Sequence, residues 1–215
     1  MKLYLASNGF PTRNQFKQLV GKNYSVARVA VIMSACDWRT ISERKVRYNE
    51  MRGCFKNLGI RPDIVDLRKF YSKSPVSLAK KLQQYDFLWV RGGNSFFLRY
   101  VMKKSGFDIA IKMALNKGLV YAGQSAGSVV MGPTLKYIDK VDDLSVAPKV
   151  IWRGIGLIKV VPLPHWNSPF IKKEITQIFH HLHENGTKVV KLTDREALLV
   201  LDNKITKVRA KLLRK

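Results

Sequence analysis

The chain alternates short apolar runs with amphipathic segments, and this rhythm limits its fold more than any other feature. Apolar, β-branched runs predict strands at residues 2–6, 28–33, 63–67, 86–90 and 119–122. Amphipathic segments between them predict helices at residues 14–20, 41–58, 76–84 and 95–113, the last broken near Gly106. Strand, helix and strand in succession are typical of a parallel sheet with helices on both faces.

The later part of the chain departs from this rhythm. Residues 157–161 predict a strand, residues 169–184 a helix closed by Gly186, and residues 188–208 short strands around Asp202 and Asn203. No repeat or linker interrupts the chain, and 215 residues that are 46% hydrophobic suffice for one sizeable core. We therefore expect one α/β domain over residues 1–215, with a doubly wound, mostly parallel sheet.

Composition excludes several classes of protein. No run reaches the roughly 18 apolar residues of a membrane span, so no membrane partner is expected. The first residues lack the long apolar region and small-residue cleavage site of a secretory signal. Only Cys36 and Cys54 are present, which indicates reduced thiols rather than a disulfide framework. These features predict a cytoplasmic protein.

The charge balance is strongly basic. The chain has 39 Lys and Arg residues against 15 acids, a formal net charge of +24, which makes nucleic acid a candidate partner. The basic residues are, however, scattered from Lys2 to Lys215 without an RNA-binding motif or zinc-finger spacing. We therefore expect a generally basic surface and no specific nucleic-acid binding. Such a surface would also speed the arrival of acidic substrates.

The segment with the strongest chemical signal is Gly123-Gln-Ser125-Ala-Gly127, directly after the predicted strand at 119–122. This is a G-x-S-x-G pattern at a strand-to-helix turn, where the serine hydroxyl is exposed and glycines allow close backbone approach. The turn would lie at the carboxyl ends of the strands, where ligands bind in open α/β sheets. The alternative is a tight turn whose serine only caps the following helix.

A serine nucleophile needs a base, and four histidines are available. His165 lies in a loop stiffened by Pro162 and Pro164, which suits a catalytic base; the alternative is a histidine packed against Trp166. His180 and His183 share one face of a predicted helix and resemble a metal pair. No carboxylate or cysteine completes a ligand set there, so we expect a solvated helix end and no metal.

Acyl transfer also needs donors for the oxyanion. The backbone amide of Ala126, just after the serine, is one candidate. Gly93, in the Arg91-Gly-Gly-Asn94 loop after the strand at 86–90, is the second. This loop lacks the Lys-Ser/Thr of a phosphate-binding loop, and a plain turn is the alternative interpretation.

Four motifs, RGGNSFFL, AGQSAGSVVMGP, PHWN and LTDREALLV, follow one another in this order. With them, nearly the whole chain resembles the peptidase E (aspartyl dipeptidase) and cyanophycinase family of serine peptidases. The resemblance implies a class I glutamine amidotransferase-like fold, in which Ser125 replaces the cysteine nucleophile. It further implies His165 as base and an amide of the GGN loop in the oxyanion hole.

The resemblance also implies a third triad member, an acid after a late strand, where this chain has Asp194. The family typically has Glu there. Rival acids lie between serine and histidine, in the cluster of Asp139, Asp142 and Asp143, of which Asp142 is the stronger candidate. Glu196 is the third choice. Either acid type can orient the imidazole and stabilise the imidazolium.

The resemblance implies hydrolysis of small peptides, with an N-terminal or linked aspartate as an option, and no cofactor. An acidic substrate would need a cation in the pocket, for which Arg91 and Arg153 are the candidates. Other interpretations are an esterase or amidase of the α/β-hydrolase type, a catalytically silent amidotransferase-like binding protein, and a nucleic-acid-binding protein. Whether the chain forms a homodimer stays open.

Overall fold

The computed structural model describes residues 1–202 and 204–210. The strands are β1 Lys2–Ala6, β2 Val29–Ile32, β3 Asp63–Ile64, β4 Phe87–Val90, β5 Val120–Gln124, β6 Val161–Leu163, β7 Val189–Lys191, β8 Glu196–Leu201 and β9 Lys204–Arg209. The α-helices are α1 Arg13–Val20, α2 Ile41–Lys56, α3 Pro75–Leu82, α4 Ser95–Lys104, α5 Phe107–Asn116, α6 Ala126–Val129 and α7 Lys172–Glu184. The expected alternation of strands and helices over the first 124 residues is confirmed.

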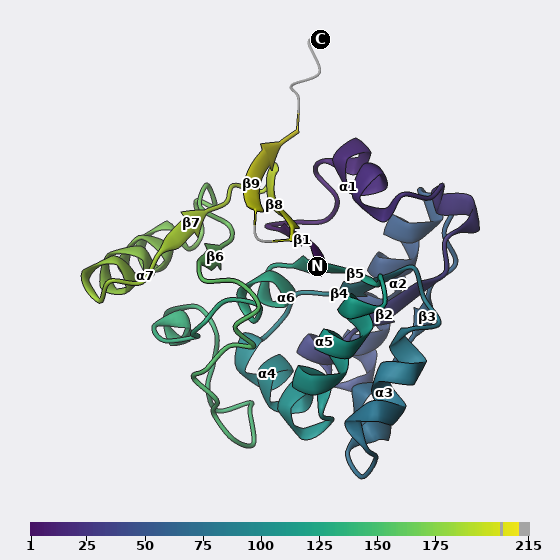
Figure 1. Ribbon diagram of the computed structural model, residues 1–215. Coiled ribbons are helices and arrows are strands. Elements are labelled where there is room, and N and C mark those ends of the chain that lie inside the picture. Colours follow the sequence, from purple (N-terminus) through teal and green to yellow (C-terminus); the bar gives the residue numbers. More distant parts are fainter. Residues whose placement is uncertain (203, 211–215) are drawn as a thin grey trace.

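Seven strands form the central sheet, in the order β3-β2-β4-β5-β1-β8-β9. Strands β1 to β5 are parallel, whereas β8 runs antiparallel to β1, and β9 antiparallel to β8. The predicted doubly wound, mostly parallel α/β sheet is therefore confirmed. Strands β6 and β7 pair in a separate two-stranded sheet. Their placement beside β8 brings two late loops toward the central sheet (Figure 1).

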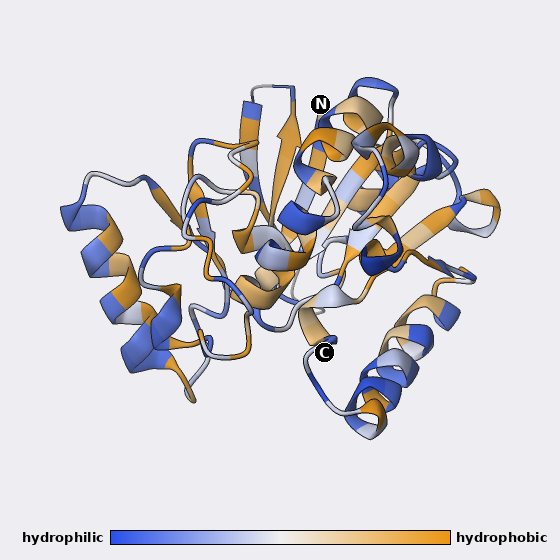
Figure 2. Cartoon of the chain, turned by 90° about the horizontal axis from the view of Figure 1, so that it is seen from below, coloured by the Kyte–Doolittle hydropathy of each residue, from blue (hydrophilic) through white to orange (hydrophobic). Residues whose placement is uncertain are grey.

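Helices cover both faces of the central sheet (Figure 1). On one face, β1, β4 and β5 direct alternate side chains toward α3, α4 and α5, in a core that includes Leu5, Leu78, Phe96 and Phe107. The other face packs against α1 and α2 through Phe16, Met51 and Phe55. The central strands are mostly hydrophobic in Figure 2, as expected for strands that are covered on both sides. All four residues of β4 are buried.

Several helices begin at residues that satisfy free backbone amides. Thr40 and Glu43 form a capping box at the start of α2. Ser74 caps α3 and is followed by Pro75, whose fixed φ suits the first helical position. Asn94 accepts from the amide of Phe97 and so caps α4, directly after the Gly92-Gly93 turn. This cap sets the direction in which the loop after β4 leaves the sheet.

The prediction of a strand at residues 157–161 is wrong in position, because β6 covers Val161–Leu163. The amides of Leu157 and Ile158 both donate to the carbonyl of Met131, so this segment packs as a loop against the chain that follows α6. The strand begins only at Val161, where β6 pairs with β7. The expected turn at Asp202 joins β8 and β9, but Asn203 lies outside the described residues. In the part of the chain that the structure covers, no helix has both the length and the apolar character needed to cross a membrane.

Candidate active site

Ser125 occupies a sharp corner between β5 and the single-turn helix α6. Its backbone has φ 50° and ψ −117°, a conformation that L-residues adopt rarely and that costs on the order of 1–3 kcal/mol. The amide of Ser125 donates to the carbonyl of Ala6, which ties the corner to β1. Because α6 contains only four residues, its individual backbone amides, rather than a helix dipole, would stabilise negative charge beside Ser125.

The two glycines of the corner are required by close backbone contacts. A Cβ on Gly123 would lie 2.4 Å from the carbonyl oxygen of Gly127, and a Cβ on Gly127 would lie 2.4 Å from that of Val90. Both distances are shorter than any real carbon–oxygen contact of this kind. Tyr121 fixes the corner further, because its hydroxyl donates to the Gly127 carbonyl at 2.6 Å. The turn therefore has the tight geometry that the G-x-S-x-G pattern predicts.

The structure brings together the three residues expected to form a triad. The Oγ of Ser125 lies 2.9 Å from Nε2 of His165, and Nδ1 of His165 lies 2.8 Å from Oδ1 of Asp194. In the tautomer that suits catalysis, Nδ1 of a neutral His165 donates to the carboxylate of Asp194 and Nε2 accepts from the serine hydroxyl. His165 has a positive φ of 59°, and Asp194 lies in the turn between β7 and β8.

Ser7, at the end of β1, supports this arrangement and was not expected from the sequence. Its hydroxyl donates to Oδ1 of Asp194 and accepts from the backbone amide of His165, both at 2.8 Å. Asn167 accepts from the amide of Asp194 and so holds the carboxylate loop from the other side. The available signal was the position of Ser7 directly after a central parallel strand, at the same edge of the sheet as Ser125.

The loop after β4 lies beside the serine. A Cβ on Gly92 would come within 2.8 Å of Cβ of Ser125, so this loop approaches the corner with nothing between them. Gly93 has φ 153° and packs against the backbone of Ala35. The amide of Ala126 immediately follows the serine. Gly93 and Ala126 thus lie on the segments where oxyanion donors are expected, and their role stays a prediction.

Known proteins of similar sequence and structure identify the family of this chain. The model of Peptidase family S51 matches residues 5–208, which is nearly the whole chain. The chain belongs to peptidase family S51. It is accordingly an enzyme, a serine peptidase, and the expected membership of the peptidase E family is confirmed.

Relatives of this S51 peptidase occur in several bacteria. The chain is 34% identical over 130 residues to the uncharacterized peptidase Lin0382 of Listeria innocua, covering 60% of this chain and 61% of that relative. It is 27% identical over 209 residues to the uncharacterized peptidase PM1590 of Pasteurella multocida, covering 96% of each. A crystal structure of a protein provisionally named peptidase E, from Listeria monocytogenes EGD-e, matches with a TM-score of 0.81 over 98% of both chains at 23% identity. That likeness supports the fold.

The rival acids of this S51 peptidase serve other parts of the structure. Asp142 accepts from the backbone amide of Ser95 at 2.8 Å and so caps the start of α4. Burial raises the pKa of Asp142, and the hydrogen bond from Ser95 partly offsets this effect. Glu196 accepts from the amide of Thr193 at 2.8 Å and pairs with Lys207 at 3.3 Å. Neither carboxylate has a hydrogen bond with His165 in the described part of the chain.

The candidate cations differ in their surroundings. Arg91 is largely buried and forms a 2.7 Å ion pair with Glu50. Arg153 has an exposed side chain, and its carbonyl accepts from Arg99. The histidines of α7 contact aromatic rings: His181 stacks on Tyr137 and His183 on Phe179.

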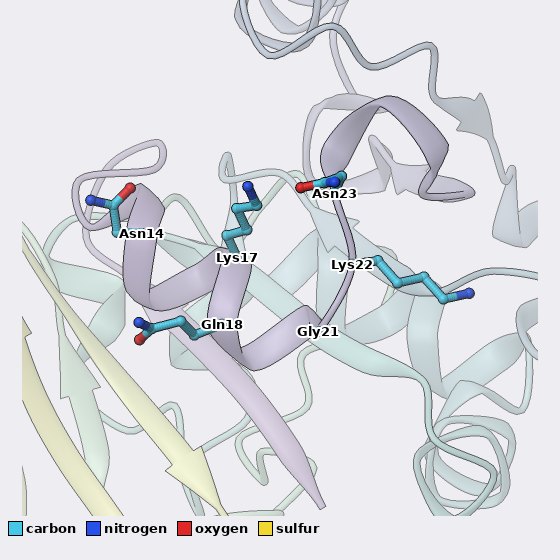
Figure 3. Close-up of a pocket in the computed structure, with 6 residues that line it drawn as sticks. All are labelled: Asn14, Lys17, Gln18, Gly21, Lys22 and Asn23. Atoms are coloured by element: carbon cyan, nitrogen blue, oxygen red, sulfur yellow. The ribbon is translucent and has the colours of Figure 1, made fainter.

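A separate hollow of about 560 Å³ lies at the end of α1, and none of the residues that line it belongs to the Ser125 site (Figure 3). Its walls are amide and lysine side chains and Gly21, with no serine, cysteine or histidine among the residues that line it. Lys22 points away from the other labelled side chains and pairs with Asp86 at 2.7 Å. This hollow lacks the hydroxyl and imidazole pair that acyl transfer by a serine peptidase needs, so we expect hydrolysis at the Ser125 edge of the sheet.

Proposed function

We propose that the chain hydrolyses short peptides through an acyl-enzyme on Ser125, with His165 as general base and Asp194 as the group that orients it. The observation that supports this most strongly is the chain of hydrogen bonds from Ser125 Oγ to His165 Nε2, 2.9 Å, and from His165 Nδ1 to Asp194 Oδ1, 2.8 Å. These distances allow proton transfer without rearrangement of the side chains. The family assignment supports a peptide bond as the target.

In the first half of the reaction, His165 removes the proton of Ser125 while Oγ forms a bond to the carbonyl carbon of the substrate. The resulting oxyanion accepts hydrogen bonds from the amides of Ala126 and Gly93. Asp194 stabilises the imidazolium that has formed. His165 then gives its proton to the leaving amine, the carbon–nitrogen bond breaks, and the acyl group stays on Ser125.

In the second half, water replaces the amine. His165 takes a proton from the water, the hydroxide adds to the acyl carbon, and the same amides hold the second oxyanion. The collapse of this intermediate returns the proton from His165 to Ser125 Oγ and releases the carboxylic acid. These steps require only protein side chains, backbone amides and water.

The family resemblance implies an aspartyl substrate, and the net charge of +24 would favour the arrival of acidic peptides. Peptides with an aspartate are therefore the second candidate for the preferred substrate. Arrival rate and pocket preference are separate quantities, however, because the first depends on the whole surface and the second on the residues beside Ser125. We therefore confine the proposed substrate class to short peptides.

The test is turnover of short peptides by wild-type enzyme and by Ser125→Ala. We expect the substitution to reduce kcat by about a millionfold, the size of effect known for serine proteases. Ser145→Ala, a change at an exposed serine outside the site, is the matched control and should keep wild-type rates. Equal rates for wild type and a folded Ser125→Ala variant would overturn the proposal.

A further inference from the structure

A pocket of about 220 Å³ is lined in part by residues that directly neighbour the candidate active site in the sequence. Three of its lining residues are direct neighbours of site residues in the sequence. Gln124 precedes Ser125, Asn8 follows Ser7, and Arg91 precedes Gly92, the residue that lies against Ser125. A hydrogen bond joins two of the three, because Gln124 Nε2 donates to Asn8 Oδ1 at 2.9 Å. The lining of the pocket therefore reaches the residue that precedes the nucleophile in β5.

Strand alternation places the pocket on the α1 and α2 face of the sheet. Successive side chains of a strand point to opposite faces, so Gln124 shares the face of Val120 and Ala122. Both of these belong to the core beneath α1 and α2. The base of the pocket is aromatic: Phe10 and Trp89 have ring centroids 3.9 Å apart, and Phe55 packs edge-on against both.

His165 reaches Ser125 from the opposite face. The anchor of its loop is the side chain of Ser7, which accepts from the amide of His165, whereas the side chain of Asn8 accepts from Gln124 beside the pocket. Strand β6, which leads to His165, also packs in the core of that opposite face through Val161 and Leu163. Because His165 must protonate the leaving amine, the leaving half of a substrate lies on its side. The acyl half then lies over the pocket at Gln124.

Among the described residues that line the pocket, Arg91 is the one with a positive charge, and it is already paired with Glu50. Its Nη2 donates to Glu50 Oε2 at 2.7 Å, and its Nη1 donates to the Gly92 carbonyl at 3.3 Å. Arg47, one turn earlier on α2, also donates to both oxygens of Glu50, at 3.0 and 3.2 Å, and so holds this carboxylate beside Arg91. An aspartate side chain that entered the pocket would meet this carboxylate and would have to displace it from Arg91.

We infer that this pocket receives the side chain of the substrate residue whose carbonyl is attacked, and that it selects an uncharged, apolar side chain over aspartate. The aromatic base stabilises an apolar group by burial. An acidic side chain would lose hydration in the pocket and would meet a guanidinium that is already paired with Glu50. A lysine side chain would bring a second positive charge beside Arg91. The inference rests on the proposed function, since it takes Ser125 and His165 as the reacting pair.

The experiment compares dipeptides X-Ala in which X is Leu, Phe, Asp or Lys, with release of alanine as the readout. We expect kcat/KM for Leu-Ala and Phe-Ala to exceed that for Asp-Ala by about tenfold or more. Glu50→Gln, which removes the negative charge that neutralises Arg91, should raise kcat/KM for Asp-Ala relative to that for Leu-Ala by about tenfold. Glu184→Gln makes the same change of charge at the exposed end of α7 and should leave this ratio within about twofold.

A second variant tests the size of the pocket without changing charge. Cys54 lines the pocket and is exposed, so Cys54→Phe should fold and partly fill the space. It should lower kcat/KM for Phe-Ala about tenfold more than kcat/KM for Ala-Ala. Equal losses for both substrates would contradict the assignment of the pocket.

Preference of the wild type for Asp-Ala, or an unchanged Asp-to-Leu ratio in Glu50→Gln, would overturn the inference while leaving the proposed hydrolysis intact. Binding of the same dipeptides to Ser125→Ala by calorimetry gives the ranking without turnover. If Ser125→Ala kept wild-type rates, the proposed function would fail instead, and the calorimetric ranking would still decide for or against the pocket.

Discussion

At the scale of single residues, the choice of triad acid has the sharpest consequence. Asp194 contacts the imidazole, whereas Asp142 caps α4 and Glu196 binds Thr193 and Lys207. We expect Asp194→Asn to lower kcat/KM by about 10⁴-fold, because an amide no longer holds the productive tautomer of His165.

Asp142→Asn is the matched comparison, since it removes the same charge from a second acid of the site region. Its effect on kcat/KM should be smaller than that of Asp194→Asn by at least about tenfold, because the substitution weakens only a helix cap. Steady-state kinetics of the two variants, with circular dichroism to verify folding, decide between them. A larger decrease for Asp142→Asn would assign the third triad position to Asp142.

Ser7 gives a second prediction at this scale. Ser7→Ala removes the donor to Asp194 and the acceptor for the amide of His165. Hydrogen bonds to charged groups contribute about 1.5–3 kcal/mol, so kcat should fall about tenfold to a hundredfold. KM should change much less, because Ser7 positions the triad and does not line the substrate pocket. An unchanged kcat would show that the triad holds its geometry without Ser7.

The site residues differ in how far they could be predicted. Ser125 and His165 were recognisable because each lies in a short, stiff segment with a local signal of glycines or prolines. Ser7 and Glu50 had no such signal. Their partners are distant in the chain, and only the sheet order brings β1 beside β8, and α2 beside the end of β4. The roles of Gly93 and Ala126 remain predictions.

At the scale of elements, the corner between β5 and α6 depends on Gly127. A Cβ there would meet the Val90 carbonyl at 2.4 Å, so Gly127→Ala must displace either α6 or β4. We expect the free energy of unfolding to fall by about 1–3 kcal/mol, the usual cost of overpacking. Activity should fall as well, because the displacement moves Ser125. Denaturant titration and peptide turnover measure the two effects.

Gly53→Ala is the matched control for this change. Gly53 lies inside α2 with open space around it, so alanine should raise the free energy of unfolding by about 0.5–1 kcal/mol. If both substitutions had the same effect on stability, the close approach at Gly127 would not be the cause.

Strands and helices were predicted correctly where the hydrophobic pattern of the sequence was strong. Apolar runs such as the one in β4 identified the central strands, because those strands are covered on both faces. The prediction failed at residues 157–161, where an apolar run packs as a loop and the strand begins at Val161, one residue before Pro162. Hydrophobicity indicates burial there, but the hydrogen bonds to Met131 decide the conformation.

At the scale of the whole molecule, the net charge of +24 calls for its own test. A scattered basic surface binds DNA through its phosphates, without preference for sequence. We expect weak retention of unrelated duplexes that falls about 10³-fold or more between 50 and 200 mM salt. Fluorescence anisotropy with several duplexes measures this. A marked preference for one duplex at physiological salt would instead indicate a specific nucleic-acid site.

The central claim is that Ser125 is the nucleophile. Intact-mass spectrometry after treatment with a fluorophosphonate, followed by peptide mapping, tests it most directly. We expect one adduct per chain, on Ser125, abolished in Ser125→Ala, strongly slowed in His165→Ala, and unaffected in Ser145→Ala. Absence of any adduct on Ser125 in the folded wild-type enzyme, or equal labelling of Ser125→Ala, would contradict the account.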